Sequence, residues 1–402
     1  MNTTADKTYK AAIIGCGRVA WLLDKDPLIP NKPCTHAGAY QAVDRTEIVA
    51  AADIRADRIH DFSKEYNVDN VYLEYREMLK KESPDIVSIC AYAPERFNMV
   101  VDALHAGVKG IWCEKAFATS LSEAEEMVRL CQDHGAMLIV SHMRRWSSDY
   151  KLARELISDG VIGEPVSVVS HFSGNMIHTG THAFDVLRFF FGDATLVQGS
   201  LEAFDSTKNF NLCGWHFAHP RTRQHHVACP LCGALYVGDG APTLRGQPVP
   251  KRGFRNESHR WKNFISRDTG GYALICFDSG VYATVHADSK GYFIFEFDIM
   301  GTEGRIRIGN RLFELYLAEA SRTESGLIEL YRKEMNLEGN NLWTKAVEHL
   351  VACMEGKAEN ISGPSDGMAA LEIALAIHES HQKQGRVVGL PLENRTLRVM
   401  SR

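Results

Sequence analysis

The feature that most constrains the fold of this chain is an alternation of short β-branched runs with helix-length segments, which continues to about residue 145. Such alternation is typical of βαβ units, whose parallel strands form one sheet with helices on its faces. The expected strands are AAIIG (11–15), EIVAAAD (47–53), DIVSICA (85–91), GIWCEK (110–115) and AMLIVSH (136–142). We therefore expect residues 1–145 to form an α/β domain with a doubly wound parallel sheet.

A different pattern begins near residue 146, and 402 residues exceed the usual size of one hydrophobic core. Turn signals such as DSG and GTEG separate successive strand candidates, which is typical of hairpins in an antiparallel sheet. These candidates are VSVVSHFSG, YALICFD, VYATVHAD, FIFEFDIMG and RIRIG, and two helical patterns follow them. Residues 146–402 are therefore expected to form an α+β domain with a large, mostly antiparallel sheet.

The composition favours a cytoplasmic enzyme. Apolar residues make up 45% and charged residues 24% of the chain, which are ordinary globular values. The formal charge of -5 gives no reason to expect a nucleic-acid partner. The first ten residues contain no apolar signal region, and no run approaches the roughly 18 apolar residues of a membrane span.

A glycine-rich turn follows the first expected strand, in the context that a dinucleotide-binding site requires. Gly15 permits a tight turn, Gly17 lets the backbone approach a pyrophosphate, and Ala20 packs the expected helix against the strand. Asp53 ends the second strand, where a carboxylate can accept ribose hydroxyls and would repel a 2′-phosphate. The pattern predicts NAD in preference to NADP, although a plain glycine turn and a solvated strand end remain alternatives.

Two further motifs carry candidate catalytic groups. Lys115, after Glu114, ends a strand at the carboxyl edge of the sheet, where it can polarise the oxygen of an alcohol or ketone. His182 and Asp185 are three residues apart at a helix start, and histidine is the natural acid or base near neutral pH. The alternatives are a structural Glu–Lys ion pair and a capping or core histidine.

These features together resemble the Gfo/Idh/MocA family, which includes glucose-fructose oxidoreductase and inositol dehydrogenase. The motifs GCGRVA, CEKAFATS, VIGEP, GTHAFD and GTEGRIRIG, together with Asp53, occur in the family's order. The resemblance covers nearly the whole chain except residues 205–268. It implies a Rossmann domain, Lys115 and His182 as the catalytic pair, and a second sheet that holds the substrate and often the oligomer contact. A homo-oligomer, either dimer or tetramer, is expected.

The resemblance also implies further site residues. Arg144 and Arg145 follow the last strand of the first domain, in a stretch that lines the family's active site, so either can bind an anionic substrate group, although a structural role is an equal alternative. The expected substrate contacts are Arg144, Arg145 and Asp185. The expected cofactor contacts are Gly15, Gly17, Arg18, Val19, Ala20, Asp53, Ile54, Arg55, Tyr92, Glu114 and Lys115.

The sequence departs from the family pattern in three motifs. Ala116 stands where the family usually has the proline of EKP. His178 occupies a position that is commonly Asp or Asn, and this imidazole is expected to join the catalytic groups. The stretch ICAYAPERF makes Tyr92 and Arg96 non-standard contacts. These departures leave open the substrate and the occurrence of net redox turnover.

Residues 205–268 form a basic segment without clear periodicity, with ten Lys and Arg against four Asp and Glu. The cysteines and histidines of this segment supply two pairs of sulfur and nitrogen ligands, which suit a tetrahedral structural zinc. Such a zinc would stabilise a segment that lacks an apolar face. The alternatives are unligated thiols and a redox-active CxxC. The predicted ligands are Cys213, His216, Cys229 and Cys232, with His219 as the alternative to His216.

The leading functional hypothesis is NAD-dependent interconversion of a hydroxyl and a keto group on a sugar, amino sugar or cyclitol. The second hypothesis is redox-neutral chemistry, such as epimerisation or glycoside cleavage through a transient ketone with tightly held NAD. The third is a non-catalytic metabolite sensor or nucleic-acid binder that uses the basic segment. Intact Lys115 and His182 argue against the third hypothesis.

Overall fold

The computed structural model describes residues 7–202, 266–288, 292–337, 339 and 341–401, and four two-residue strands between residues 227 and 248. The predicted zinc ligands lie outside the described residues. Their metal site therefore stays a prediction. No helix in the described part of the chain is long and apolar enough to cross a membrane.

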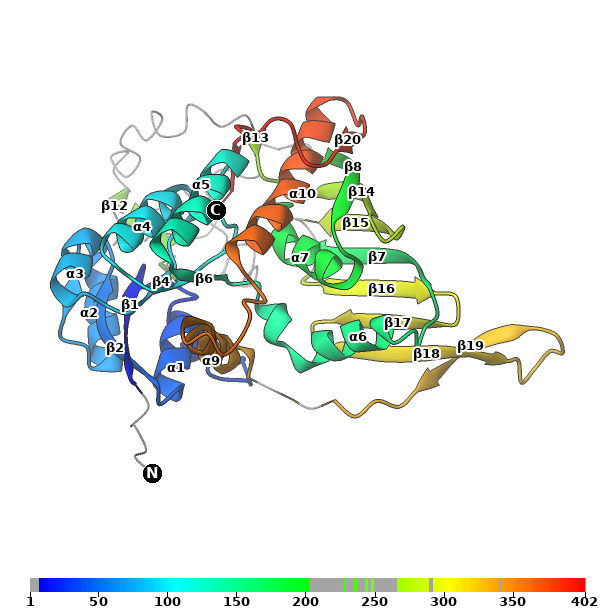
Figure 1. The fold of residues 1–402 in the computed structure, drawn as a ribbon, viewed down its shortest axis with the longest axis horizontal. Helices are drawn as coiled ribbons and strands as arrows, with labels where there is room; N and C mark the ends of the chain where they lie inside the picture. Colours follow the sequence, from blue (N-terminus) through cyan, green and yellow to red (C-terminus); the bar gives the residue numbers. More distant parts are fainter. Residues whose placement is uncertain are drawn as a thin grey trace.

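The first sheet has six parallel strands in the order β3-β2-β1-β4-β5-β6 (Figure 1), which confirms the predicted doubly wound arrangement. All four residues of β4 and all four of β5 are buried, as expected where helices cover both faces of a parallel sheet. The short β3 was not predicted. The strands are β1 (Tyr9–Ile14), β2 (Thr46–Ala52), β3 (Val71–Tyr72), β4 (Ile86–Ile89), β5 (Gly110–Cys113) and β6 (Met137–Val140).

Five helices accompany these strands. One of them, α5, begins where the Ser120 hydroxyl accepts from the Glu123 amide and ends at Gly135, which has a φ of 57°. These are favourable caps, because they satisfy backbone groups that the helix leaves unpaired. The helices are α1 (His36–Ala42), α2 (Ala56–Tyr66), α3 (Tyr75–Glu82), α4 (Ala93–His105) and α5 (Leu121–His134).

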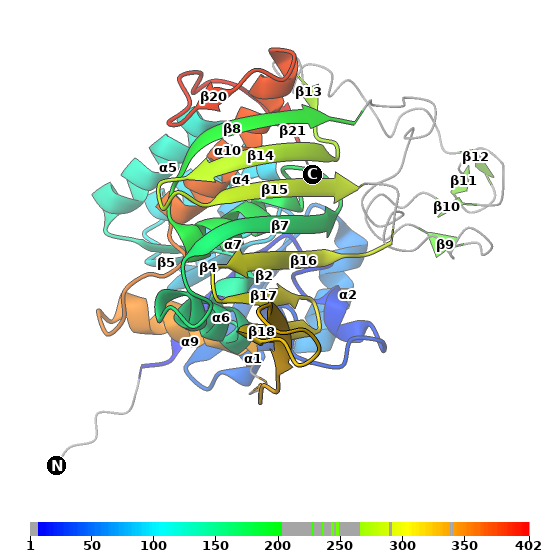
Figure 2. The same ribbon diagram turned by 90° about the vertical axis from the view of Figure 1, so that its right-hand side faces the viewer.

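The second sheet has nine strands in the order β19-β18-β17-β16-β7-β15-β14-β8-β20 (Figure 2). Its pairs are antiparallel except that β7 and β15 run parallel at the centre, which confirms the predicted large, mostly antiparallel sheet. Alternate residues of β15 are buried and exposed, because one face packs on helices and the other faces outward. The strands are β7 (Pro165–Ser173), β8 (Ala194–Leu201), β14 (Gly271–Phe277), β15 (Tyr282–Asp288), β16 (Phe295–Gly301), β17 (Gly304–Gly309), β18 (Leu312–Ala320), β19 (Ile328–Lys333) and β20 (Val388–Gly389).

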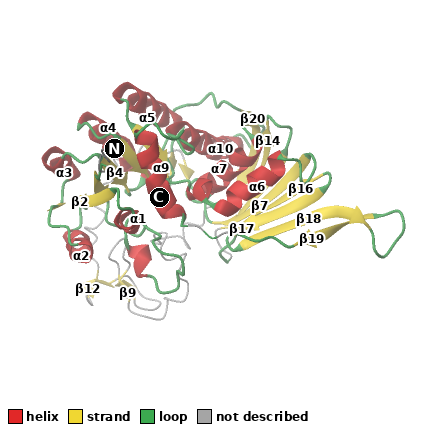
Figure 3. Ribbon diagram, turned by 60° about the horizontal axis from the view of Figure 1, so that its bottom comes forward, coloured by secondary structure: helices red, strands yellow, loops and turns green. Residues whose placement is uncertain are grey.

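Helices α6 (Ser148–Ser158), α7 (Gly180–Phe191) and α10 (Pro364–Gln382) cover one face of this sheet (Figure 3). Helix α9 (Leu342–Met354) instead lies beside α1 in Figure 1. Its buried residues Ala346, Val347 and Leu350 belong to the hydrophobic cluster of the first domain. A helix within residues 146–402 therefore packs on the first sheet, because its apolar face matches that surface.

Candidate active site

The glycine turn after β1 has the backbone geometry that a dinucleotide site needs. Gly15 has a φ of 91°, and a Cβ atom added there would lie 3.1 Å from the carbonyl carbon of Cys90. A Cβ atom added at Gly17 would meet only Arg58 Nη1, at 3.8 Å. The space in front of Gly17 is therefore open to a ligand, while Ala20 is fully buried as expected.

The helix expected to open at this turn is interrupted before α1, as the inserted loop DKDPLIPNKPC (24–34) predicts. Residues 17–21 form turns and Leu22–Lys25 a 3-10 helix, and α1 begins only at His36. The His36 and Ala37 amides donate to the carbonyls of Val19 and Ala20 at 3.1 and 2.9 Å, so α1 continues the first turn. The intervening segment contains three prolines, which lack the amide that a continuous helix would use.

Asp53 follows β2 and ties the glycine turn to that strand. Its Oδ2 accepts from the Cys16 amide at 2.7 Å, and its Oδ1 accepts from the Arg55 amide at 2.9 Å. Because a carboxylate has about four acceptor positions, capacity remains for ribose hydroxyls. Ile54 beside it is 90% exposed, and the Arg55 side chain pairs with Asp57.

Glu114 directly follows β5 and lies within a buried polar network. Its Oε1 lies 3.2 Å from His36 Nε2, and the other ring nitrogen of His36 lies 2.8 Å from Ser88 Oγ. Burial alone would raise the pKa of Glu114, but His36 and the charges on Lys115 and Arg96 lower it to about 2. Glu114 is therefore a fixed anion beside Lys115.

Lys115 connects the two domains. Its ammonium group donates to the carbonyl oxygen of His178, which precedes α7. Burial lowers the pKa of Lys115, Glu114 raises it and Arg96 lowers it, with a net value of about 8. The Lys115–Ala116 peptide bond is cis, and the buried Arg96 guanidinium donates to the Ala116 carbonyl. A lysine with this pKa can exchange a proton near neutral pH.

His182 lies in the first turn of α7, close to a second imidazole. Its ring centroid is 6.0 Å from that of His142, which follows β6. Burial lowers the pKa of His182 well below its usual value, and the charges on Lys115, Arg144, His142 and His178 lower it further. His182 is therefore neutral near pH 7. The structure brings the predicted groups Lys115, His178 and His182 together.

Arg145 and Asp185 lie beneath this cluster and not in it. Asp185 is fully buried, and Arg145 Nη2 pairs with its Oδ1 at 2.8 Å and with Asp366 at 3.0 Å. His142 Nδ1 lies 2.9 Å from the same Asp185 oxygen. Burial would raise the pKa of Asp185, but His142 and Arg145 lower it to about 2. Both residues were expected to contact the substrate. In this structure their side chains pair with each other, and Arg145 also pairs with Asp366.

Three residues of the site were not predicted from the sequence. His36 is the first residue of α1, and Asp268 is the last residue of the segment 205–268, which lacks clear periodicity. Asp268 accepts from the Ile177 and His178 amides, both at 2.8 Å, and thereby holds the carbonyl that receives Lys115. Of these three residues, only His142 could have been expected in the site from the sequence, because it follows a parallel strand at the same sheet edge as Lys115.

The remaining predicted cofactor positions lie along that edge. Arg18 and Val19 are partly buried after β1, and Tyr92, at the start of α4, is 48% exposed. Within the described ranges, no group of three or more His, Cys, Asp or Glu side chains is arranged to hold a metal ion.

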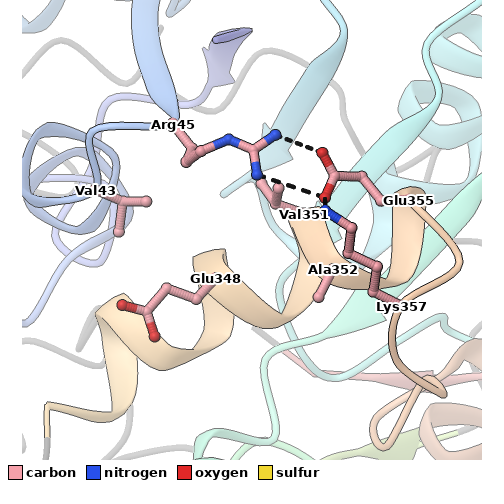
Figure 4. A pocket seen from close by; sticks show the side chains of 7 residues that line it. All are labelled: Val43, Arg45, Glu348, Val351, Ala352, Glu355 and Lys357. Carbon is pink, nitrogen blue, oxygen red and sulfur yellow. Dashed lines mark hydrogen bonds and ion pairs between the residues drawn. The ribbon is translucent and has the colours of Figure 1, made fainter. Parts of the chain in front are cut away.

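A separate pocket of about 220 Å³ lies at the opposite, amino edge of the first sheet (Figure 4). Val43 and Val351 contribute apolar surface to it. The Arg45 guanidinium pairs with Glu355, which also contacts Lys357 Nζ at 2.8 Å. These charges satisfy one another, and the pocket is remote from Lys115.

Two named relatives are dehydrogenases. D-apiose dehydrogenase of Paraburkholderia graminis is 30% identical over 222 residues, which cover 51% of this chain and 56% of that protein. Myo-inositol 2-dehydrogenase of Thermotoga maritima is 21% identical over 198 residues, or 46% of this chain and 55% of that protein. The chain thus matches about half the length of these relatives.

Solved structures match over nearly the whole chain. An oxidoreductase from Agrobacterium radiobacter in complex with NAD+, L-tartaric acid and magnesium has a TM-score of 0.66, at 17% identity and 95% and 98% coverage of the two chains. The WlbA dehydrogenase of Bordetella pertussis, in complex with NADH and UDP-GlcNAcA, has a TM-score of 0.65, at 15% identity and 96% and 100% coverage. At these sequence identities, the structural similarity shows that the chains share a fold.

Two family models match consecutive parts of the chain. Residues 9–142 match the NAD-binding Rossmann fold of an oxidoreductase family, and residues 170–390 match the C-terminal alpha/beta domain of the same family. Together they cover the first sheet, nearly all of the second sheet and the edge at which Lys115 meets His178. The chain belongs to the Gfo/Idh/MocA oxidoreductase family.

Proposed function

We propose that this protein is an NAD-dependent oxidoreductase that interconverts a hydroxyl and a keto group on a sugar, amino sugar or cyclitol. The observation that carries the proposal is the meeting of Lys115, from the first domain, with His178 and His182, from the second. The names of the relatives, D-apiose dehydrogenase and myo-inositol 2-dehydrogenase, support the substrate class.

The residues present fit NAD. The open space at Gly17 suits a pyrophosphate, and Asp53 offers acceptor positions for ribose hydroxyls and repulsion for a 2′-phosphate. NAD, when bound, supplies the hydride acceptor of the oxidation. Asp53 thus favours NAD over NADP.

Lys115 is proposed to take the proton of the reacting hydroxyl. A pKa of about 8 makes the neutral amine about 10% of the population at pH 7, roughly 300-fold more than at the ordinary value of 10.5. His182 is neutral in the same range, so it can accept a hydrogen bond from the substrate or relay the proton. In the reverse direction, protonated Lys115 would donate to the keto oxygen.

The test is reduction of NAD by a panel that includes D-apiose, myo-inositol and common aldoses. Lys115→Ala should lower turnover by roughly 100-fold or more, a typical contribution of general acid–base catalysis, with little change in NAD affinity. Lys80→Ala, at an exposed position of α3, is the matched control. Undiminished turnover in Lys115→Ala would show that Lys115 does not take the proton of the reacting hydroxyl.

The redox-neutral alternative predicts substrate consumption without accumulation of NADH, and the same assay separates it from net oxidation. The cytoplasmic location stays a prediction.

A homo-oligomer is also proposed, through the outward face of the second sheet, where Tyr272 and Tyr282 are 60% and 55% exposed. Light scattering of the purified protein tests this state.

A further inference from the structure

A short segment, residues 397–401, connects the two domains beside the candidate active site, and we call it the strap. Its strand β21 (Val399–Met400) pairs in parallel with β13 (Ser266–Arg267) of the second domain. Leu397 and Val399 are each 1% exposed. In Figure 1 the strap lies close to α5 of the first domain. Backbone pairing and the burial of two apolar side chains fix its path.

On the side of the first domain, the strap contacts the segment that follows Lys115. Arg398 Nη2 pairs with Glu123 Oε1 at 2.6 Å. The other carboxylate oxygen of Glu123 accepts from the amide and the hydroxyl of Thr119, at 3.1 and 2.6 Å. Residues 116–118, between Lys115 and Thr119, are at most 1% exposed. Because a closely packed segment transmits displacements, Arg398 acts on the backbone that carries the lysine.

On the side of the second domain, the strap contacts Asp268. Ser401 is 5% exposed, and its hydroxyl donates to Asp268 Oδ2 at 2.9 Å. The same carboxylate accepts from the Ile177 and His178 amides. The carbonyl oxygen of His178 in turn accepts from the Lys115 ammonium group. Ser401 therefore reaches Lys115 through two intermediate residues of the second domain.

The chemistry of Lys115 depends on this closed arrangement. Burial is the largest influence on its pKa, and together with neighbouring charges it lowers the pKa from 10.5 to about 8. Separation of the two domains at this point would expose the ammonium group to water and raise its pKa. The charged and titratable groups around it are Glu114, Arg96, Asp268, Arg144, His142, His178 and His182.

We infer that Arg398 and Ser401 are positioning residues, through which the strap holds Lys115 against the turn before α7. This inference rests on the proposed function, in which Lys115 transfers the proton. Arg398 acts through Glu123, and Ser401 acts through Asp268. Loss of both contacts should slow proton transfer without removing a group that touches the substrate or NAD.

The first test measures turnover and NAD affinity of the double variant Arg398→Met/Ser401→Ala in the full chain, with the most active sugar of the panel. Its kcat should fall roughly 10-fold, because a misplacement of about 1 Å can cost about 100-fold, while the KM for NAD stays within about 2-fold. Arg398→Lys keeps a cationic donor and should retain most of the rate. Arg395→Met is the matched control, because Arg395 pairs with the exposed Glu125 of the same helix and leaves Glu123 in place. It should change stability and not kcat.

The second test needs no substrate. Acetylation of Lys115 by acetic anhydride is followed by mass spectrometry from about pH 6 to 11, because only the neutral amine reacts. The midpoint should rise from about 8 in the unmodified protein toward 10.5 in the double variant. A strap that only stabilises the fold predicts the same midpoint in the double variant as in Arg395→Met.

The outcomes separate this inference from the proposed function. A midpoint in the double variant that matches the midpoint of Arg395→Met overturns the inference. A raised midpoint supports it, and if the unmodified protein then shows no NAD-linked turnover of any sugar, the proposed function alone fails. If circular dichroism shows that the double variant does not fold, Ser401→Ala decides the question. Its single lost hydrogen bond should raise the midpoint by a smaller amount, and an unchanged midpoint overturns the inference.

Discussion

Lys115 is expected to set the pH dependence of the oxidation. Its neutral form accepts the proton, so kcat/KM should rise with pH and level off above the Lys115 pKa of about 8. Two neighbouring charges act on this pKa in opposite directions, because Glu114 raises it and Arg96 lowers it. Removing either charge should therefore move the profile in a predictable direction.

Glu114→Gln removes the anion that stabilises the ammonium form, so the midpoint should fall below 8. Arg96→Met removes a cation that repels the ammonium, so the midpoint should rise above 8. A neighbouring charge at about 4–6 Å shifts a pKa by one unit or more, so each change should be about one unit. At pH 7, Arg96→Met would then reduce the neutral fraction of Lys115 roughly 10-fold.

The assay is the initial rate of NADH formation at low substrate concentration from about pH 6 to 10. A constant ionic strength is needed, because salt screens partly exposed charges. Lys115→Arg should lose the rising limb, since a guanidinium does not deprotonate in this range. Shifts of the same sign in Glu114→Gln and Arg96→Met would refute the electrostatic reasoning, and a midpoint unchanged in both would remove Lys115 as the titrating group.

Four further expectations concern other parts of the chain. Asp53→Asn should weaken NAD binding and narrow the NAD–NADP difference in calorimetry, and tighter binding of NADP by the unmodified protein would contradict the assigned role. His182→Ala should lower turnover by roughly 100-fold with NAD affinity retained, and near-normal turnover would remove it from catalysis. Asp185→Asn should destabilise the protein by about 3 kcal/mol in denaturant unfolding, because it leaves Arg145 with one carboxylate fewer. In the matched control Asp193→Asn, at a 71% exposed carboxylate, the free energy of unfolding should change by less than about 0.5 kcal/mol. Elemental analysis should find about one zinc per chain, lost in Cys229→Ser, and metal-free protein would refute that prediction.

The parts of the fold that follow from short contiguous patterns were predictable from the sequence. The parallel sheet follows from alternating runs, and the glycine turn and Lys115 follow from their places directly after strands. The carboxyl ends of parallel strands meet at one edge, so the sequence could place Lys115 and the cofactor turn together. The prediction of His182 as a catalytic residue depended on its motif and on the family resemblance.

The tertiary structure decided which polar groups are neutralised and which are left available. Arg144 and Arg145 are adjacent and chemically identical, yet only Arg145 meets the buried carboxylate of Asp185 and the half-buried carboxylate of Asp366. The parallel pairing of β7 with β15 and the return of α9 to the first domain likewise join residues far apart in the chain. Local propensity and periodicity carry no information about such partners, because charge compensation depends on distances that only the folded chain creates.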